Sequence, residues 1–587
     1  MCYAVEVRQA KGARMARTID TGAQGFEELR TSEAFYVDKT AFIREWWRTL
    51  DQVTLVCRPR RFGKTLNLDT LRCFLSTEYV GRGEELFSGL DVWEGGTQAE
   101  REEMRALQGT VPVVFLSFAD VKDPTYAEMQ RHVCELVALL YEDYDYLLEW
   151  EGLRQSERAR FERVRDDMDA LTCTRALNHL CRMLLRCHGT KPVVLLDEYD
   201  APMQQAWEHG FWGEASSFMR RLMNSTFKTN KALGRGLITG VTRVSRESIF
   251  SDLNNLEVVS TSSGKYRTCF GFTEAETFSA LEEFGLGGER GDVQGWYDGY
   301  TFGGKGSIYN PWSVTKFLES GGHYDAYWAN TSSGGLISSV VRRGRPRLKR
   351  DFEELMRGGI VEKVIDEQVV FSELDTRVDA AWALLLAAGY VTAPGPVPRN
   401  VVRTPRRLEL TNLEVRETFD RMVAGWFEEA ADDYDEFCAA ILRGDARIAT
   451  RCLAEVVLCC ASSFDSGKRP SERSEPERFY HGLVLGMLAR LRGRYAVESN
   501  RESGYGRYDV ALVPMSGVSG SEPAVVIEFK VFDPDFEQTL EDTCARALDQ
   551  IEDRRYVQGL VERGIRRERI YMYGMGFQGK EVLVRLG

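Results

Sequence analysis

Residues 58–65 read Arg-Pro-Arg-Arg-Phe-Gly-Lys-Thr, and this motif is the clearest indication of the fold of the N-terminal half. It directly follows an apolar run at 53–57 and precedes a helical pattern that starts at Lys64. A strand, a Gly-containing loop and a helix in this order are typical of a phosphate-binding loop, whose backbone N–H groups and helix N-terminus hold phosphate oxygens. We therefore predict an α/β nucleotide-binding domain with this loop at its site.

The side chains of the loop have predicted roles in binding ATP and Mg²⁺. Lys64 reaches the β- and γ-phosphates, and the Thr65 hydroxyl holds Mg²⁺. The other residues predicted to line the nucleotide are Arg60, Arg61, Phe62 and Gly63. Arg58 stands where the usual pattern has its first Gly, and a bare Gly-Lys-Thr also fits an ordinary turn that opens a helix.

A second motif favours the nucleotide site. The apolar run 193–196 ends in Asp197 and Glu198. At the end of a strand, Asp197 is suited to bind Mg²⁺ and Glu198 to activate the attacking water, although acids in such a place also cap a following helix. Farther on, the run 236–239 ends in Thr239, predicted to sense the γ-phosphate, with Arg243 or Arg246 as a counter-charge.

The rhythm of the chain predicts a multidomain α/β protein. The apolar runs 53–57, 111–116, 193–196 and 236–239 alternate with helical patterns, which indicates a parallel sheet buried on both faces. The predicted domains are a P-loop ATPase core at 20–265, a Gly- and aromatic-rich helical lid region at 266–345, a helical, winged-helix-like module at 346–460 and a C-terminal α/β domain at 475–587. In the third of these, Gly389 is predicted to end a helix before a small β-hairpin that runs through 408–410.

Charged residues on two predicted strands indicate a second site in the C-terminal domain. Asp509 lies on one strand, and Glu528 and Lys530 lie on the run 524–531, two residues apart and therefore on one face. Two carboxylates suit Mg²⁺, and Lys530 is suited to orient or deprotonate a water that attacks a phosphodiester. The alternative is an ordinary hairpin whose Glu and Lys pair in solvent. A following helix is predicted to carry Gln550 and Tyr556 behind the site.

Composition narrows the class of protein. The 587 residues carry a formal net charge of −13, which excludes a histone-like positive coat but permits local basic clusters such as those at 342–350 and 554–569. No run of about 20 apolar residues predicts a membrane span, and no signal peptide is evident, so we expect a cytoplasmic protein. The 13 cysteines include no Cys-x-x-Cys pair, as expected of reduced, buried thiols.

The chain resembles a known family over nearly its full length. Besides 58–65 and 195–200, the resembling segments are 35–40, 248–256, 296–300 and 309–312. The family comprises AAA-ATPase-like proteins with a C-terminal PD-(D/E)XK nuclease-like domain, found widely in bacteria. Its pattern carries Arg-Pro-Arg-Arg-Phe-Gly-Lys, so the resemblance makes Arg58 a family feature.

The resemblance implies further site residues and a function. It implies that Glu477, on the first helix of the nuclease-like domain, joins Asp509 and Glu528 near a metal, with Gln550 also at the site. Tyr508 stands where the superfamily's name has Pro. The leading hypothesis is an ATPase whose nucleotide state regulates a Mg²⁺-dependent nuclease acting on nucleic acid, with DNA favoured over RNA and self-association left open. The alternatives are a STAND-like signalling or nucleic-acid-binding switch with an inert nuclease-like domain, and an ATP site that binds without turnover.

Overall fold

The computed structural model describes most of the chain from residue 16 onward. It leaves out residues 24, 244–248, 251–252, 329–336, 338–339, 341–345, 357, 367–377, 398–403, 420, 422–430, 461–479, 481–483, 486, 489–490, 492–493, 504–505, 516–521 and 579–580. The chain divides into two compact units: residues up to 343 together with 354–418, and residues 344–353 together with 419–587. Helix α17, Pro346–Met356, crosses this division along the sequence.

The first unit is built on a parallel sheet of five strands in the order β2-β3-β4-β1-β5. The strands are β1 Val53–Cys57, β2 Val113–Ser117, β3 Val193–Asp197, β4 Arg235–Gly240 and β5 Leu256–Val259. Each of the four predicted apolar runs overlaps one of these strands, and the run 53–57 coincides with β1. The parallel sheet predicted from them is confirmed.

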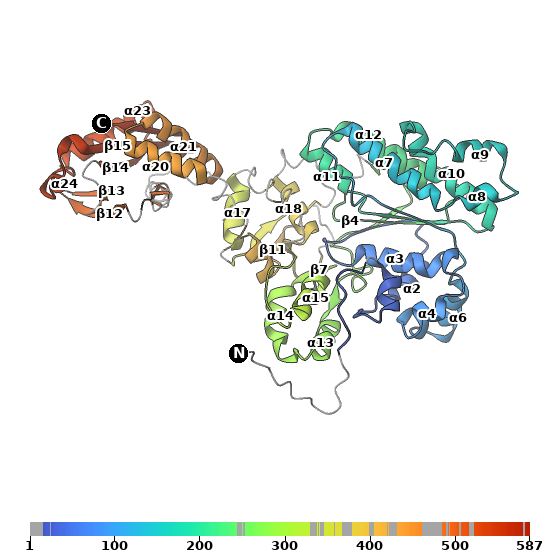
Figure 1. Cartoon of the computed structure of the whole chain (residues 1–587). Coiled ribbons are helices and arrows are strands. Elements are labelled where there is room, and N and C mark those ends of the chain that lie inside the picture. The colour runs from blue at the N-terminus through green and yellow to red at the C-terminus, as the bar shows by residue number, and fades with distance from the viewer. Residues whose placement is uncertain are drawn as a thin grey trace, which may run out of the picture. The chain divides into compact units, whose positions relative to one another are not determined.

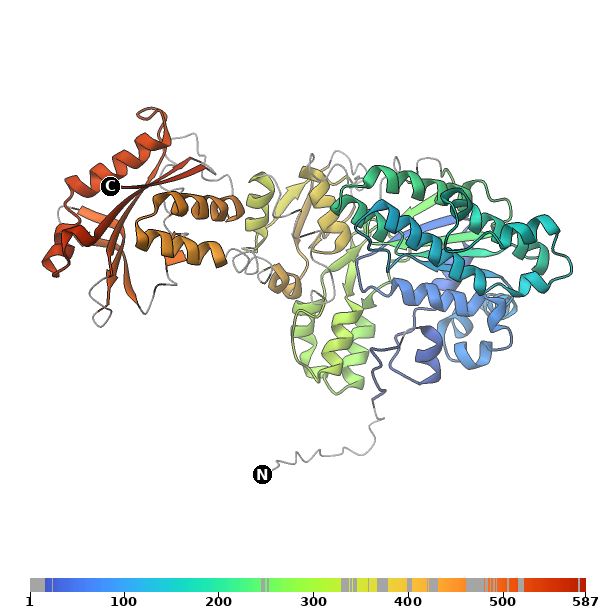
Figure 2. The ribbon, with the colours of Figure 1, turned by 45° about the horizontal axis from the view of Figure 1, so that its top comes forward.

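Helices cover both faces of this sheet (Figures 1 and 2). α2 Ala41–Arg48, α3 Lys64–Leu75, α4 Gly83–Phe87 and α6 Gln98–Leu107 lie on one face, with α1 Phe26–Thr31 and α5 Asp91–Glu94 packed against members of this group. On the other face lie α7 Tyr126–Glu142, α8 Tyr146–Glu149, α9 Gln155–Phe161, α10 Ala170–His188, α11 Ala201–Glu208 and α12 Trp212–Met223. Because both faces are covered, the central strands consist mainly of buried apolar residues.

Alternation along the strands assigns each side chain to one face. Val56, Leu195, Leu237 and Val259 share one core cluster with Leu68 of α3. Their neighbours in sequence therefore face the other group of helices. On that second face Gly236 lies so close to Phe227 that a Cβ there would sit 2.5 Å from the ring, which explains a Gly inside this strand.

Two small antiparallel sheets complete the first unit. One has the order β6-β8-β7, with β6 Phe272–Thr273, β7 Tyr300–Phe302 and β8 Lys305–Tyr309, flanked by α13 Glu274–Glu283, α14 Arg290–Tyr297 and α15 Pro311–Glu319. The other has the order β10-β11-β9, with β9 Val361–Lys363, β10 Val391–Thr392 and β11 Arg406–Leu410. In the sequence, α18 Val378–Ala388 lies between β9 and β10. Gly389 ends α18 with a φ of 86°, and β10 pairs with β11, so the predicted helix end and hairpin are confirmed.

The second unit is a five-stranded mixed sheet with helices on both faces. Its order is β12-β13-β14-β15-β16, and only the β14–β15 pair is parallel. The strands are β12 Tyr495–Ser503, β13 Gly506–Pro514, β14 Ala524–Val531, β15 Ile570–Gln578 and β16 Glu581–Leu586. The helices include α20 Ala431–Arg443, α21 Ala446–Cys460, α23 Leu540–Asp553 and α24 Gln558–Glu562.

The face on which each residue of β14 lies follows from its core partners. Val525, Ile527 and Phe529 pack in the cluster of α20 and α21. Ala524 and Val526 pack instead in a cluster with Ile551 of α23, so Glu528 and Lys530 lie on the α23 face. Residues 431–460, predicted to belong to the middle module, thus pack on this sheet, while the four predicted domain boundaries remain predictions.

Two further findings concern composition. Within the residues that the structure describes, no helix is long and apolar enough to cross a membrane. Ten of the cysteines have described side chains; all ten are free, and nine of them are buried, as the sequence predicts.

Candidate nucleotide and metal sites

The phosphate loop leaves the end of β1 and enters α3 as predicted. Gly63 has a φ of 74°, a left-handed conformation that glycine adopts without strain. Lys64 is the first residue of α3, and its Nζ donates to the backbone carbonyls of Arg58 (3.1 Å) and Pro59 (2.9 Å). Burial holds the pKa of Lys64 below its ordinary value, and the carboxylates of Glu198 and Asp197 partly offset this effect.

Arg58 and Phe62 anchor the loop to neighbouring segments of the first unit. The guanidinium of Arg58 donates to the carbonyl of Ser260 (2.7 Å) and lies 4.2 Å from the centre of the Phe302 ring. Phe62 packs edge-to-face on Tyr300 with ring centres 4.7 Å apart. Arg58 thus replaces the flexible Gly of the usual pattern with a buried anchor.

Arg60 and Arg61 point to two other elements. Arg60 donates to Oε1 of Gln204 on α11 (2.9 Å), and the guanidinium of Arg61 lies 4.5 Å from the centre of the Trp312 ring on α15. Arg61 has a φ of 65°, which costs a non-Gly residue about 1 kcal/mol. The side chains of Arg60 and Arg61 thus contact helices outside the loop. This arrangement is compatible with backbone N–H groups of the loop as the phosphate ligands.

Asp197 lies between two hydroxyl groups at the carboxyl ends of the central strands. Thr65 Oγ1 donates to Asp197 Oδ2 (2.6 Å), and Thr239 Oγ1 donates to the other carboxylate oxygen. Asp197 is buried, and desolvation raises its pKa above the ordinary range, opposed by these two hydrogen bonds. The structure thus brings together three residues predicted from separate segments of the chain.

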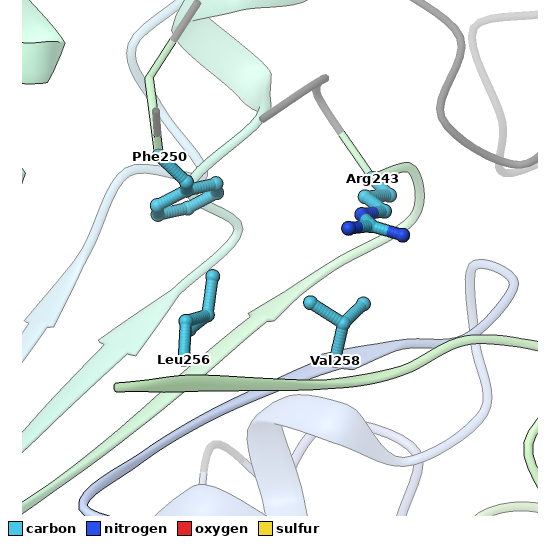
Figure 3. Close-up of a pocket in the computed structure, with 4 residues that line it drawn as sticks. All are labelled: Arg243, Phe250, Leu256 and Val258. Atoms are coloured by element: carbon cyan, nitrogen blue, oxygen red, sulfur yellow. The ribbon is translucent and has the colours of Figure 1, made fainter. Parts of the chain in front are cut away.

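Glu198 and Arg243 differ in their surroundings. Glu198 has a φ of 47°, and such left-handed non-Gly residues cluster at functional sites. Arg243 lines a small cavity of about 150 Å³ together with Phe250, Leu256 and Val258 (Figure 3). Its guanidinium therefore lies above β5, and its predicted role at the γ-phosphate stays a prediction. Arg246 lies outside the described residues.

Sequence reasoning assigned no role to Asp200, although the structure gives its carboxylate three partners. Asp200 Oδ2 accepts from the backbone N–H groups of Val241 (3.0 Å) and Thr242 (2.8 Å) and from the Thr242 hydroxyl (2.8 Å). The signal in the sequence was its place two residues after Glu198, directly after an apolar strand. Its partners lie 41 and 42 residues away and had no signal of their own.

The C-terminal site consists of side chains that bond to one another. Asp509 Oδ2 accepts from the backbone N–H of Phe529 (2.9 Å), which places it next to Glu528 on the neighbouring strand. Lys530 Nζ donates to Glu528 Oε1 (3.1 Å), and Gln550 Nε2 donates to the same oxygen. Glu528 is buried, with 2% of its surface exposed, so its charge is held by these partners inside the domain.

Two other residues, Glu477 and Tyr556, were predicted to lie at or behind this site. Glu477 lies outside the described residues. Tyr556 was predicted on the same helix as Gln550, but α23 ends at Asp553, and Tyr556 follows in the turn before α24. Gln550 Nε2 still reaches its hydroxyl (3.3 Å), because the turn folds back toward the helix. In the part of the chain that the structure describes, no cluster of three or more His, Cys, Asp or Glu side chains forms a complete metal site.

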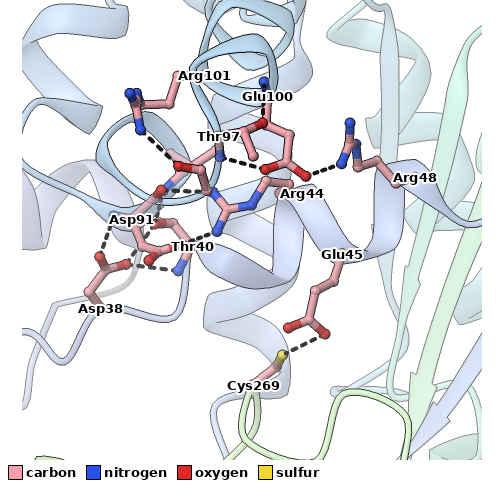
Figure 4. Close-up of polar contacts among 12 residues, drawn as sticks. Asp38, Thr40, Arg44, Glu45, Arg48, Asp91, Thr97, Glu100, Arg101 and Cys269 are labelled. Atoms are coloured by element: carbon pink, nitrogen blue, oxygen red, sulfur yellow. Dashed lines mark hydrogen bonds and ion pairs between the residues drawn. The ribbon is translucent and has the colours of Figure 1, made fainter.

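Two side chains of the segment 35–40 bind the start of α5 (Figure 4). Asp38 accepts from the backbone N–H groups of Thr40 (2.8 Å) and Asp91 (2.6 Å), and the Thr40 hydroxyl accepts from Val92 N–H (3.0 Å). Both side chains thereby cap the start of α5, whose first N–H groups have no partner within the helix.

Comparisons with known proteins agree with this geometry. Residues 20–250 match a family model described as a predicted AAA-ATPase, and residues 475–585 match the model of the PD-(D/E)XK nuclease superfamily. A protein of Azotobacter chroococcum mcd 1, described as an uncharacterized protein in the vnfD 5′ region, is 26% identical over 404 residues, which cover 68% of each chain. No solved structure matches the chain.

Proposed function

Because the chain carries an AAA-ATPase-like domain at 20–250 and a PD-(D/E)XK nuclease superfamily domain at 475–585, we propose that it is an ATPase whose nucleotide state regulates a Mg²⁺-dependent nuclease. The observation that carries the proposal is the contact of Thr65 with Asp197. A hydroxyl from the phosphate loop and a carboxylate from the end of a neighbouring strand are the two groups that hold Mg²⁺ in P-loop NTPases.

The residues of the first site fit ATP and Mg²⁺. Thr65 and Asp197 would hold the ion, since their oxygens already lie 2.6 Å apart. Lys64 would exchange its two carbonyl partners for phosphate oxygens, because a buried ammonium gains more from an anion than from neutral carbonyls. Glu198 would accept the proton of the attacking water, and Thr239 would contact the γ-phosphate.

The residues of the second site fit a metal-dependent cut in nucleic acid. Asp509 and Glu528 lie on adjacent strands and would hold Mg²⁺, with Glu477 as a further ligand, and the bound ion supplies charge stabilisation for a phosphodiester. Lys530 would orient or deprotonate the attacking water, and Gln550 holds Glu528 in place. The class of partner is nucleic acid, with DNA proposed over RNA. Self-association and a cytoplasmic location stay predictions.

A cleavage assay tests this proposal. The full chain is incubated with Mg²⁺ and ATP and with linear, circular and single-stranded DNA and with RNA. We expect cutting of at least one DNA substrate, and a loss of at least about 100-fold after Glu528→Ala combined with Lys530→Ala. Asp549→Ala, which changes an acidic residue of α23 next to Gln550, serves as the control.

The outcomes separate the proposal from its rivals. Absence of cutting of every substrate, or equal cutting by the double variant, contradicts the nuclease. Nucleic-acid binding that the double variant keeps, together with ATP-dependent self-association, would support the switch with an inert nuclease-like domain. ATP binding without phosphate release by the wild type or by Glu198→Gln would indicate a site that binds without turnover, whereas equal release by both would exclude the proposed role of Glu198.

A further inference from the structure

The last residue of the Asp-Glu-Tyr-Asp segment, Asp200, makes contacts that suggest a part in ATP hydrolysis. Only 7% of its surface is exposed, and its Oδ2 accepts the three hydrogen bonds from Val241 and Thr242. These partners belong to the turn that leaves β4. The carboxylate therefore ties the end of β3 to the end of β4, the two strands that carry Asp197 and Thr239.

An ordinary structural role for Asp200 would look different. Asp200 occupies the N-cap position of α11, where an Asp side chain usually accepts from its own helix and contributes about 1 kcal/mol. Here the side chain makes no such capping bond. It accepts hydrogen bonds from a segment about 40 residues farther along the chain instead. The carboxylate therefore connects the two strand ends and does not stabilise the start of α11.

Tyr199 reinforces the same contact. Its N–H donates to the carbonyl of Thr239 (3.1 Å), and its hydroxyl donates to the carbonyl of Thr242 (2.8 Å). Gly240 lies between the two side chains: a Cβ there would sit 2.6 Å from Asp200 Oδ1 and 2.7 Å from the Tyr199 ring. Residues 199–200 and 239–242 thus interlock so closely that only glycine fits at 240.

These contacts fix Glu198 from both sides. Asp197 before it is held by Thr65 and Thr239, and Tyr199 after it is held by the β4 turn. A left-handed non-Gly residue costs about 1–3 kcal/mol and persists only when its surroundings impose it. The contacts of Asp200 are part of what imposes the conformation of Glu198. Lys64 Nζ and the Thr65 hydroxyl donate their hydrogen bonds to Arg58, Pro59 and Asp197, and Asp200 acts on Lys64 through its charge.

We propose that Asp200 is a positioning residue for ATP hydrolysis, which clamps the turn after β4 and thereby holds Glu198 and Thr239 in the geometry for attack on the γ-phosphate. This inference rests on the proposed ATPase function. It assigns Asp200 to the rate of turnover and not to nucleotide affinity, because the hydrogen bonds of Lys64 and Thr65, which are proposed to bind the phosphates and Mg²⁺, go to other residues.

The test uses the full chain with Asp200→Asn, which keeps the size of the side chain but replaces the charged acceptor of the three hydrogen bonds with a neutral amide, whose hydrogen bonds are weaker. ATP affinity is measured by equilibrium binding in Mg²⁺, and kcat by phosphate release at saturating ATP. We expect kcat to fall by at least about tenfold, which is a barrier change of about 1.4 kcal/mol, with affinity changed by less than about twofold. Asp166→Asn, at an exposed position, is the matched control.

A second pair of variants approaches the same contact from the other side. Thr242→Val removes one of the three hydrogen bonds and should lower kcat in the same direction by a smaller factor, whereas Thr242→Ser keeps the hydroxyl and should restore the wild-type rate. The double variant Asp200→Asn with Thr242→Val should lose less than the two single losses combined, because both changes weaken one shared contact. If Asp200→Asn does not fold, as judged by circular dichroism, the Thr242 pair decides.

Each result has one reading. A wild-type kcat in both Asp200→Asn and Thr242→Val, losses that add in the double variant, or an equal loss of affinity and kcat would overturn the positioning role. If the wild-type chain itself releases no phosphate, the proposed ATPase function fails and the inference fails with it. Turnover in the wild type with unaffected variants overturns the inference alone.

Discussion

The two candidate sites are held in place in different ways. The side chains of the phosphate loop reach outward, to Ser260, Phe302, Gln204 and Trp312, which belong to four separate segments of the first unit. In the C-terminal site, Lys530 and Gln550 both bond to Glu528, and all three lie on one strand and one adjacent helix. The first site is tied to several segments of the unit around it, whereas the described residues of the second lie on a strand pair and its covering helix.

This difference has a functional meaning. A loop that is tied to several segments can pass a change at the nucleotide to those segments, because packed elements shift together. A self-contained site gains rigidity instead, and its geometry changes only if the domain itself changes. We therefore expect the regulation to start at the phosphate loop and the cutting chemistry to be fixed in the C-terminal unit.

The largest difference should appear in stability. Phe62→Ala removes a phenylalanine that is 1% exposed and should lower the free energy of unfolding of the first unit by about 3–5 kcal/mol. Gln550→Ala removes the hydrogen bonds to Glu528 and Tyr556 in the C-terminal site and should cost about 1–2 kcal/mol. Denaturant unfolding measures both, with Phe536→Ala as a control because that ring is 80% exposed. Equal costs at the two sites would contradict the comparison.

Much of this arrangement was predictable, and the rest depended on distant contacts. The apolar runs located β1 and β3, and the Gly-Lys-Thr and Asp-Glu pairs located Lys64 and Asp197, because these features are local in sequence. The strand β5 was missed because its four residues carry too short an apolar pattern.

The anchoring of the sites was not predictable in the same way. Arg58 contacts Ser260, which lies 202 positions away, and Asp200 contacts Thr242, which lies 42 positions away. The hydrophobic pattern of the sequence predicts neither contact. The backbone of Glu198 is also set by these neighbours and not by its own preference, which disfavours a left-handed conformation. Glu477 and Arg246 lie outside the described residues and stay predictions.

A buried carboxyl in the first unit predicts a pH-dependent stability. Glu414 accepts from the Ser313 hydroxyl (2.8 Å) and from the Trp328 N–H (2.8 Å), and burial raises its pKa to about 7. Because the folded state holds this proton more tightly than the unfolded state, the stabilisation is complete below about pH 4.5 and is lost as the pH rises through about 7.

Glu414→Gln should remove this dependence. Between pH 5 and pH 8 the wild type should lose up to about 3 kcal/mol of stability relative to the variant, since each pKa unit corresponds to about 1.4 kcal/mol. Thermal unfolding of both proteins across this range measures the difference. Glu362→Gln, at an exposed position, should leave the pH dependence unchanged. A wild-type profile as flat as that of Glu414→Gln would contradict the assigned role.

Lys64→Ala should weaken ATP binding by about 100-fold, because a charged hydrogen bond to the phosphates is worth about 1.5–3 kcal/mol. Lys191→Ala, an exposed lysine before β3, should bind ATP as the wild type does. Equilibrium binding of a fluorescent ATP analogue provides the measurement. Affinity that survives in Lys64→Ala would place the nucleotide elsewhere.

The smallest effect is expected at the rim of the C-terminal unit. Arg563 on the turn after α24 forms an ion pair with Glu498 of β12 (3.1 Å), and its side chain is 41% exposed. Arg563→Ala should lower stability by less than about 1 kcal/mol, since solvent and salt screen such pairs. A larger loss in denaturant unfolding would show that the C-terminal site depends on contacts beyond its own strand and helix.

The most direct test of the account is cleavage of linear DNA in Mg²⁺, measured with and without ATP for the wild type and for Lys64→Ala. The account predicts that ATP changes the rate for the wild type by about 5- to 150-fold, the range of ordinary coupling between two sites, and leaves the rate for Lys64→Ala unchanged. Cutting by the wild type at one rate with and without ATP, or absence of cutting in both conditions, would contradict it.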